Sequence, residues 1–331
     1  MGVCFEYGLG TNKNLLYAFE QYQKAAGMEY LDAQYALARC YLYGIGAEKN
    51  AVSAFVCYEK AAVSGHPASQ YQYAYCYENS IGCQKDMANA LEWYDKAAKS
   101  GNTSAMCRLG QLFQAGIKDI LAVDLERSFS LFQDAANQDV PQAYYEVANC
   151  YSDGLGVEKN NELAFEYAMK SALKKNPDGL YAVGTCYEYS IGVEKRNMEL
   201  AITYYENAAQ LGSTKAMTAL GFCFLKGKTG TVDTKMSMKY FRKAAKKGDT
   251  VAQYQLALLY KKGIGGRTSH ALAAKWLSEA AHHDYPKALY ELALYTITGI
   301  NEDNYALKPD QVQAEALLMR SALVPRTMVK L

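Results

Sequence analysis

The stretch Ala33-Gln-Tyr-Ala-Leu-Ala-Arg-Cys-Tyr41 returns later in the chain as Ala252-Gln-Tyr-Gln-Leu-Ala-Leu-Leu-Tyr260. Related stretches recur every 36 to 38 residues, and a truncated copy comes first, since Cys4-Phe5 aligns with Cys40-Tyr41. A fixed period of this length is the signature of a repeat architecture. It predicts one array over residues 1–331, with a partial repeat over 1–32 and eight repeats that start at 33, 69, 105, 143, 179, 216, 252 and 288.

Each repeat contains two helix-like segments joined by a glycine-containing turn. The first segment has the small and apolar spacing of one helical face, as in Ala105-Leu109-Gly110-Phe113. It ends at Gly-x-Gly or a close variant such as Gly44-Ile45-Gly46, where glycine supplies the left-handed residue that closes a helix. A column of short polar residues then predicts the N-caps of the second helices. These residues are Asn14, Asn50, Asp86, Asp124, Asn160, Asn197, Asp233, Ser269 and Asp310.

Pairs of short helices cannot bury their apolar faces without neighbours, so the repeats must stack on one another. The sequence therefore predicts an all-α fold, a right-handed α-solenoid of helix-turn-helix repeats with a 36-residue period. Small residues such as Gly110 and Gly221 are expected where two helices approach closely. A large side chain at either glycine should overpack the contact and cost about 1–3 kcal/mol.

The composition excludes an intrinsically disordered chain. Half of the 331 residues are apolar, and 35 Lys and Arg residues nearly balance 34 Asp and Glu residues. No run approaches the about 18 consecutive apolar residues that a membrane helix needs. Met1-Gly-Val-Cys-Phe-Glu6 lacks the charged and apolar regions of a signal peptide, so we expect a cytoplasmic location.

The pattern Ala-x-x-x-Leu-Gly-x-x-Tyr, the Gly-x-Gly turn and the helix at Trp93-Tyr-Asp-Lys-Ala-Ala98 resemble Sel-one-like repeats, a variant of the tetratricopeptide repeat. The resemblance covers essentially the whole chain and implies a non-catalytic scaffold or adaptor. Members include an adaptor in endoplasmic-reticulum-associated degradation, activators of fungal chitin synthase, and bacterial proteins that engage host cells. A secreted branch staples its repeats with cysteines eight residues apart, where this chain has pairs such as Ala62 and Gln70. The resemblance therefore favours a reducing compartment without that disulfide framework.

Residues with catalytic or metal-binding potential form no recognisable site. Six of the nine cysteines occupy one repeat column that leucine fills elsewhere, so we expect a buried apolar role for Cys4, Cys40, Cys76, Cys150, Cys186 and Cys223. Gly263-Ile-Gly-Gly266 has helical segments on both sides, whereas a dinucleotide fingerprint follows a strand. The four histidines lack further ligands at suitable spacing. We expect no enzyme activity, no cofactor and no metal.

The remaining candidates lie on one face of the first helices. In tetratricopeptide-type solenoids the first helix of each pair lines the concave groove. This resemblance points to the second, sixth and ninth positions after the small residue that starts each repeat. Interfaces favour tyrosine and arginine, which combine a large contact area with hydrogen bonding. We expect a protein or peptide partner to contact Tyr35, Arg39, Tyr71, Tyr75, Glu78, Gln111, Tyr145, Asn149, Tyr181 and Thr185. The pattern leaves open that the tyrosines only pack between adjacent first helices.

One segment departs from the balance of charge. Residues 226–247 hold eight basic residues and a single acidic residue, Asp233. The segment is either a solvated outer helix or a docking patch for an acidic partner, a phosphoinositide surface or RNA. No interleaved stacking motif supports RNA, so nucleic acid is the less favoured partner. The candidate patch consists of Lys226, Lys228, Lys239, Arg242, Lys243, Lys246 and Lys247.

These observations predict a non-catalytic scaffold or adaptor that binds a protein or peptide segment in the concave groove. The alternatives are a regulatory subunit similar to the chitin synthase activators, and a peripheral membrane or nucleic-acid binder that uses the basic patch. Membrane contact would be indirect or through that patch. Residues 301–313 interrupt the last repeat, and their role stays open.

Overall fold

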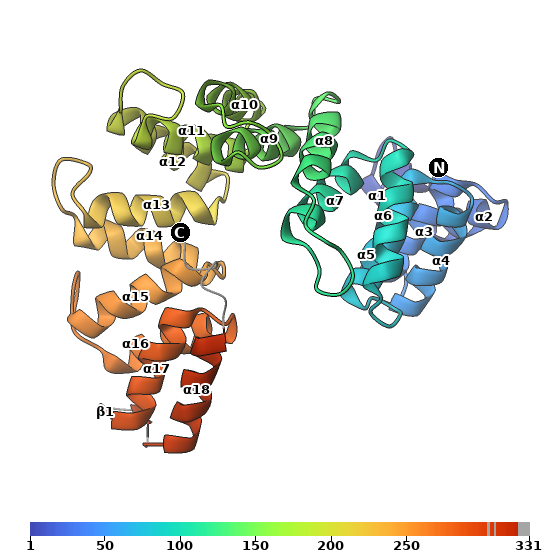
Figure 1. The fold of residues 1–331 in the computed structure, drawn as a ribbon. Helices are drawn as coiled ribbons and strands as arrows, with labels where there is room; N and C mark the ends of the chain where they lie inside the picture. The colour runs from blue at the N-terminus through green and yellow to red at the C-terminus, as the bar shows by residue number, and fades with distance from the viewer. Residues whose placement is uncertain (303–304, 308, 324–331) are drawn as a thin grey trace. The chain divides into compact units, whose positions relative to one another are not determined.

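The computed structural model describes residues 1–302, 305–307 and 309–323, which are helical almost throughout (Figure 1). The elements are α1 (Gly2–Tyr7), α2 (Leu15–Gly27), α3 (Leu31–Tyr43), α4 (Ala51–Val63), α5 (Pro67–Asn79), α6 (Met87–Lys99), α7 (Thr103–Ala115), α8 (Leu125–Ala136), α9 (Pro141–Asp153), α10 (Asn161–Leu173), α11 (Pro177–Tyr189), α12 (Met198–Gln210), α13 (Thr214–Leu225), α14 (Thr234–Lys246), α15 (Thr250–Lys262), α16 (His270–His282), α17 (Pro286–Thr298), β1 (Ile300–Glu302), β2 (Tyr305–Leu307) and α18 (Gln311–Leu323). None of the described helices is long and apolar enough to cross a membrane.

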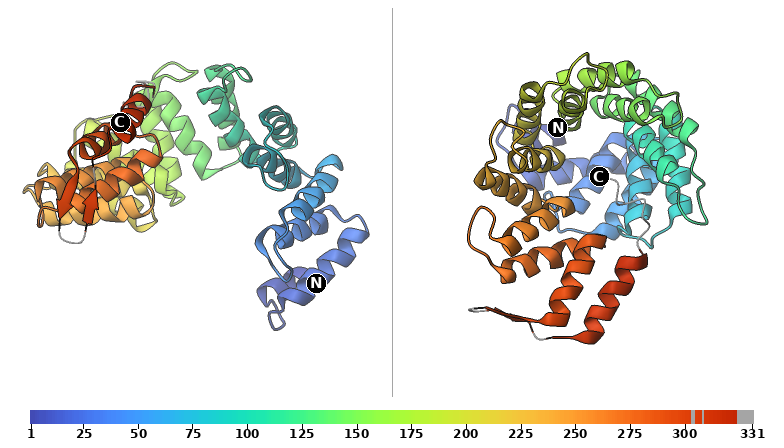
Figure 2. Two further views of the ribbon diagram at one scale, coloured as in Figure 1. Left: turned by 90° about the horizontal axis from the view of Figure 1, so that it is seen from below. Right: turned by 60° about the vertical axis from the view of Figure 1, so that its left-hand side comes forward.

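The chain divides into two compact units, an N-terminal unit over Met1–Ala164 and a C-terminal unit over Phe165–Leu331. In the N-terminal unit each helix from α1 to α9 packs on the next, and in the C-terminal unit α11 to α18 do the same (Figure 2). Packing in successive pairs is the arrangement of a helical solenoid, so the predicted all-α solenoid fold is confirmed. That the two units form one continuous array remains a prediction.

The second helix of each pair begins directly after the polar capping residue that the sequence predicts. In all nine cases the side chain of the predicted cap accepts a hydrogen bond from the backbone N–H three residues later, at 2.9 to 3.2 Å. Each cap therefore pairs one of the backbone donors that a helix N-terminus otherwise leaves without a partner. The nine predicted N-caps are confirmed.

Two structural features explain the glycines of the turns, a left-handed backbone conformation and a close backbone contact. Gly44 closes α3 in the left-handed conformation, with φ of 75°. Gly46 is also left-handed, and a Cβ there would lie 2.0 Å from the carbonyl oxygen of Leu15. At Gly156 the corresponding distance to the carbonyl oxygen of Leu125 would be 1.9 Å. Leu15 and Leu125 begin α2 and α8, so this second glycine lets a turn close on the second helix of the preceding repeat.

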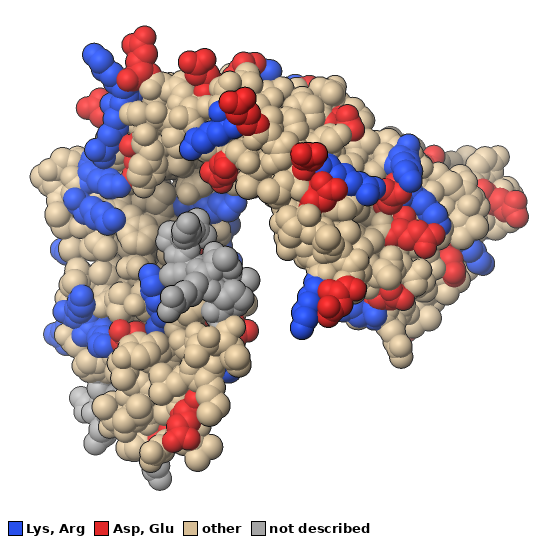
Figure 3. All heavy atoms as spheres, viewed as in Figure 1, with Lys and Arg blue, Asp and Glu red and all other residues tan. Residues whose placement is uncertain are grey.

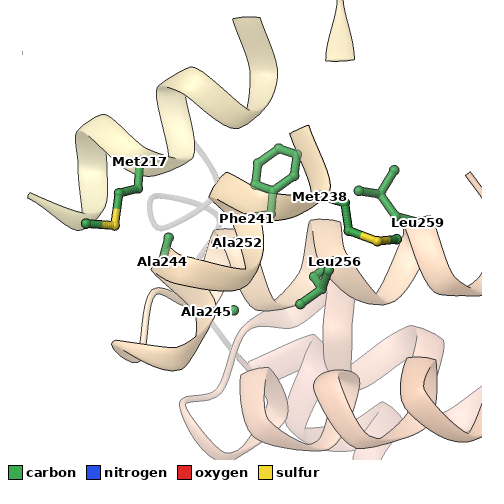
Figure 4. Close-up of a cluster of buried hydrophobic side chains, with 8 residues drawn as sticks. All are labelled: Met217, Met238, Phe241, Ala244, Ala245, Ala252, Leu256 and Leu259. Atoms are coloured by element: carbon green, nitrogen blue, oxygen red, sulfur yellow. The ribbon is translucent and has the colours of Figure 1, made fainter. Parts of the chain in front are cut away.

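The hydrophobic core lies between successive helix pairs, and Figure 4 shows one part of it in the C-terminal unit. The cluster consists of Met217, Met238, Phe241, Ala244, Ala245, Ala252, Leu256 and Leu259. The ring of Phe241 is fully buried, and a Cβ on Gly221 would lie 2.6 Å from it. Gly110 is equally close to the ring of Phe132, at 2.5 Å. The two glycines thus lie at tight helix contacts, as the sequence predicts.

Part of the segment that interrupts the last repeat is a small β-hairpin. β1 pairs antiparallel with β2, with Ile300 opposite Leu307, and β1 lies against α16. α18 begins directly after its cap, Asp310. Residues 303, 304 and 308 of the predicted insertion lie outside the described residues.

Candidate partner-binding face

The second, sixth and ninth positions of each repeat lie along one side of the first helices, because residues three and four apart share a helical face. We call this surface the first-helix face. The candidate residues on it belong to α3 (Tyr35, Arg39), α5 (Tyr71, Tyr75, Glu78), α7 (Gln111), α9 (Tyr145, Asn149) and α11 (Tyr181, Thr185).

Three of the candidate tyrosines rest on the core tyrosine of the helix that follows. Tyr35, Tyr71 and Tyr181 are half-buried. The ring centroids of Tyr71 and Tyr94 are 5.6 Å apart, and those of Tyr181 and Tyr205 are also 5.6 Å apart. Each ring therefore contributes to packing within its own repeat and still exposes part of its surface. Packing and partner contact are compatible for these residues.

The other two candidate tyrosines differ sharply in accessibility. Tyr75 is 39% exposed, whereas Tyr145 is only 8% exposed. Tyr145 therefore belongs mainly to the packing around α9, and Tyr75 is the more accessible of the two candidates. Asn149 and Thr185 are half-buried at the same repeat position as Tyr75. The repeat position alone did not reveal this difference, because burial depends on the side chains of neighbouring helices.

Glu78 is not a free carboxylate on the first-helix face. Its side chain is 10% exposed and accepts hydrogen bonds from Oη of Tyr94 at 2.7 Å and from Nε of Arg108 at 3.2 Å. Burial alone would raise the pKa of Glu78, but the hydrogen bonds from Arg108 and Tyr94 hold this pKa below its ordinary value. The ionised carboxylate joins α5, α6 and α7.

Arg39 has a similar internal role. It donates to the buried carboxylate of Glu6 at 3.1 Å, and Oη of Tyr22 donates to the same carboxylate at 2.7 Å. The Arg39 side chain is 30% exposed. The predicted contact residue therefore has an ion-pair partner on the preceding first helix.

Glu188 is a buried carboxylate of the C-terminal unit with contacts of the same kind. Glu188 accepts a hydrogen bond from Oη of Tyr205 at 2.8 Å and pairs with Nζ of Lys228. The pKa of Glu188 stays below its ordinary value because these two contacts outweigh its burial. Sequence reasoning singled out Glu78 but missed the second-helix tyrosines and Arg108. The available signal was the recurring Cys-Tyr-Glu segment at 76–78 and 186–188.

Gln111 extends the polar contacts of Glu78 to a third first helix. Its Oε1 accepts a hydrogen bond from Nη1 of Arg108 at 3.3 Å. Its Nε2 donates to Oε1 of Glu146 at 2.9 Å. A polar network therefore runs from Glu78 on α5 through Arg108 and Gln111 on α7 to Glu146 on α9.

In the C-terminal unit the first-helix face contains a pocket of about 320 Å³. It lies among α11, α13 and the beginning of α15, and the predicted residues Tyr181 and Thr185 line it. Thr218 and Phe222, which hold the same two positions one repeat later, complete this part of the wall. Lys226 and Lys228 line the pocket as well. The structure thus places candidates from the first-helix face and candidates from the basic segment in one pocket.

The basic patch does not form one surface around the pocket. Only Lys226 and Lys228 line the pocket. The other five residues, Lys239, Arg242, Lys243, Lys246 and Lys247, are exposed on or directly after α14. In Figure 3, Lys and Arg side chains gather along the edge of the molecule where α13, α14 and α15 lie. The segment is continuous in sequence but contributes to two different surfaces.

The cysteines have the properties of buried apolar residues in most repeats. Cys40, Cys76, Cys150, Cys186 and Cys223 are buried, and all nine cysteines of the chain are free. Burial raises the pKa of Cys40 to about 11 and that of Cys76 to about 12, which disfavours the reactive thiolate. Cys4, in α1, was expected to be buried but is exposed. Within the described residues, no group of three His, Cys, Asp or Glu side chains could hold a metal ion.

The architecture defines a helical-repeat protein, built from pairs of helices that pack on the next pair. The model of the Sel1 repeat matches residues 1–30, 31–66, 67–102, 103–140, 141–176, 177–213, 214–249 and 250–285. The chain therefore belongs to the Sel1 repeat family, as the resemblance in the sequence predicts. Proteins of this family are generally protein-interaction scaffolds and are generally not enzymes.

Solved structures with the same repeats are similar to most of the chain. A protective antigen of uropathogenic Escherichia coli is 26% identical with a TM-score of 0.62, and the match covers 97% of this chain and 67% of the antigen. A Sel1 repeat protein from Oxalobacter formigenes is 28% identical with a TM-score of 0.59, and the match covers 87% and 82% of the two chains. Yeast Tom70 shares the fold at 14% identity and a TM-score of 0.52, over 90% of this chain and 61% of Tom70. No curated protein matches the sequence.

Proposed function

We propose that this protein is a non-catalytic scaffold or adaptor that binds an extended segment of a partner protein along the first-helix face, in the concave groove of the solenoid. The pocket in the C-terminal unit carries this proposal. Tyr181 and Thr185 line the pocket together with Thr218 and Phe222, their equivalents in the next repeat. A hollow built from equivalent positions of adjacent helices is suited to a chain that lies across those helices.

Exposed aromatic side chains support the same proposal in the N-terminal unit. Tyr7, at the end of α1, and Tyr43, at the end of α3, are each 59% exposed. Tyr75 on α5 is 39% exposed. Aromatic residues are enriched at protein interfaces because they offer a large contact area at a small cost in side-chain entropy. A cytoplasmic location and a protein partner belong to this proposal.

Site-specific photo-crosslinking tests which face binds the partner. A photo-reactive p-benzoylphenylalanine at Tyr75 should form an adduct with the partner in native cell extract. The same group at Val52, which is 61% exposed on α4, should form none and is the matched control. Adducts from position 52 but not from position 75 would show that the partner binds second helices, and the proposal would be wrong.

Substitutions on the first-helix face supply an independent readout. Tyr71→Ala combined with Tyr75→Ala should reduce recovery of the crosslinked partner without unfolding α5, because neither side chain is fully buried. Tyr145→Ala is a poorer test, since Tyr145 is buried and its removal leaves a cavity. Unchanged recovery with the double variant, measured beside its circular dichroism, would contradict binding at this face.

A second candidate function rests on α14. Lys239, Arg242 and Lys243 are exposed on this helix, and no carboxylate of the described chain forms an ion pair with them. An acidic partner or an anionic membrane surface could dock there through electrostatic attraction. Binding that disappears as salt rises from 50 to 500 mM would favour α14, because salt screens exposed charges. Binding that persists would favour the first-helix face.

A further inference from the structure

The carboxylates that line the pocket of the C-terminal unit already have internal partners. Glu188 is 5% exposed, and its two oxygens contact Tyr205 and Lys228. Asp249 caps α15 and accepts a hydrogen bond from the backbone N–H of Ala252 at 2.7 Å. Both carboxylates of this pocket therefore already have hydrogen-bond or ion-pair partners within the protein.

The accessible charges of the pocket are positive. Lys226 is exposed, and its Nζ lies 5.5 Å from the centre of the Phe222 ring. No carboxylate in the described part of the chain lies within ion-pair distance of Lys226. An anion entering the pocket would meet the ammonium group of Lys226 first.

A buried hydroxyl lines the same pocket. Thr218 is 8% exposed, and its Oγ1 has no hydrogen-bond partner of normal geometry among the residues that the structure describes. Buried polar atoms normally have such a partner, so an isolated hydroxyl donor is unusual. The Thr218 hydroxyl nevertheless lies close enough to the Asp249 carboxylate for a side-chain hydrogen bond that offsets part of the burial raising the pKa of Asp249. A ligand oxygen in the pocket would give this hydroxyl an acceptor of better geometry.

We infer that this pocket receives the side chain of an aspartate or glutamate from the partner segment, an inference that rests on the proposed function. The ammonium group of Lys226 supplies the opposite charge, and the Thr218 hydroxyl donates to the carboxylate. The rings of Tyr181 and Phe222 contact the apolar part of the segment. A pocket of about 320 Å³ is at the small end for ligand sites and suits one or two side chains.

The charge of the pocket favours a carboxylate over a phosphate. One carboxylate carries a single negative charge, which one accessible lysine without a partner can balance. A phosphorylated side chain carries a charge of about −1.5 to −2. Glu188 and Asp249 repel any anion in this pocket, and they would repel the larger charge of a phosphate more strongly than the single charge of a carboxylate.

Selection from a phage-displayed library of random 12-residue peptides on the full chain provides the test. We expect the selected peptides to share an acidic residue at one aligned position. In fluorescence anisotropy, replacing that residue by its amide should weaken binding about tenfold. The same replacement should have little further effect on the Lys226→Gln variant, because the two groups then no longer interact.

Two further variants separate charge from local structure. Lys262→Gln is the matched control, since Lys262 occupies the same repeat position one repeat later and is exposed away from the pocket. It should leave binding unchanged. Thr218→Val keeps the volume of the side chain and removes the hydroxyl, and it should weaken binding about threefold while the circular dichroism spectrum is retained.

The outcomes distinguish this inference from the proposed function. Selected peptides that are insensitive to Lys226→Gln but lose affinity with Tyr75→Ala would leave the proposed function standing and overturn the acidic pocket. A phosphoserine peptide that binds more tightly than its glutamate counterpart would also overturn it. A library that yields no binding peptide would count against both.

Discussion

Alanine at Gly156 should destabilise the N-terminal unit far more than alanine at Gly154, two residues earlier in the same turn. Both glycines are left-handed, with φ of 72° and 73°. A Cβ at Gly154 would meet nothing closer than 3.5 Å, where it would contact Lys159. A Cβ at Gly156 would lie 1.9 Å from the carbonyl oxygen of Leu125. The first substitution therefore incurs only the conformational cost, and the second adds a backbone clash with the preceding repeat.

The magnitudes follow from these two terms. A left-handed conformation costs a residue with a Cβ about 1–2 kcal/mol, which is the whole effect expected for Gly154→Ala. Overpacking adds about 1–3 kcal/mol, so Gly156→Ala should cost about 2–5 kcal/mol in total. Repeat proteins do not unfold as a single unit, and a global melting temperature would average this local effect. Native-state hydrogen exchange of the peptides covering α8 and α9 measures the local free energy of opening instead.

The location of the loss matters as much as its size. Because Leu125 begins α8 and the turn follows α9, Gly156→Ala should reduce protection in both helices. Gly154→Ala should affect mainly the end of α9. Equal losses from the two substitutions, or a Gly156→Ala effect confined to α9, would refute the packing of this turn on the preceding repeat.

Two other substitutions test the interior of the first-helix face and the core. The pKa of Glu78 is lower in the folded state than in the unfolded state. Its contact with Arg108 therefore stabilises the fold at pH values above the unfolded pKa. This stabilisation is lost as the pH falls through the folded pKa. Glu78→Gln should lower the opening free energy of α5 and α7 at pH 7 by about 1–3 kcal/mol and remove this acid dependence; an unchanged profile between pH 3 and 7 would contradict it. Gly221→Leu should lower the free energy of opening of α13 and α14 in hydrogen exchange by about 1–3 kcal/mol, because a Cβ there would lie 2.6 Å from the Phe241 ring. Gly27→Ala, in open space within α2, is the control and should be neutral or slightly stabilising.

The helix boundaries were predictable from the sequence because capping is a local interaction. Each cap acts on the N–H group three residues away, so its residue type and its position in the repeat determine the contact. Asn14 and Asp310, at opposite ends of the chain, both form the predicted bond. The tight glycines were predictable for the same reason, since a repeat column fixes which residue faces the next helix.

The partners of the buried glutamates were not predictable, because they come from different positions of neighbouring repeats. Arg39 lies at the sixth position of its repeat, Arg108 at the third, and Lys228 in the turn after α13. All three reach an equivalent carboxylate. Which cation arrives depends on side-chain length and on the packing between repeats, and a repeat column does not encode either.

The basic residues follow one another in the sequence but do not form a single surface in the structure. Residues 226–247 begin directly after α13 and include the following turn and all of α14. The turn reverses the chain, so Lys226 and Lys228 line the pocket while the remaining basic side chains lie on the second helix. A single electrostatic patch was the natural interpretation of the sequence, and the helix-turn-helix geometry divides it.

The first-helix face therefore differs in chemistry between the two units. In the N-terminal unit, Arg39 and Arg108 are paired with buried carboxylates, and the accessible groups are aromatic, as at Tyr75. In the C-terminal unit, one lysine of the pocket, Lys226, stays accessible, and a buried hydroxyl, that of Thr218, lines the same pocket. The paired charges cannot contribute much to recognition, because breaking them would leave buried carboxylates unpaired. Under the proposed function, we therefore expect specificity for a charged partner residue to come from the C-terminal unit, and aromatic contacts to dominate binding to the N-terminal unit.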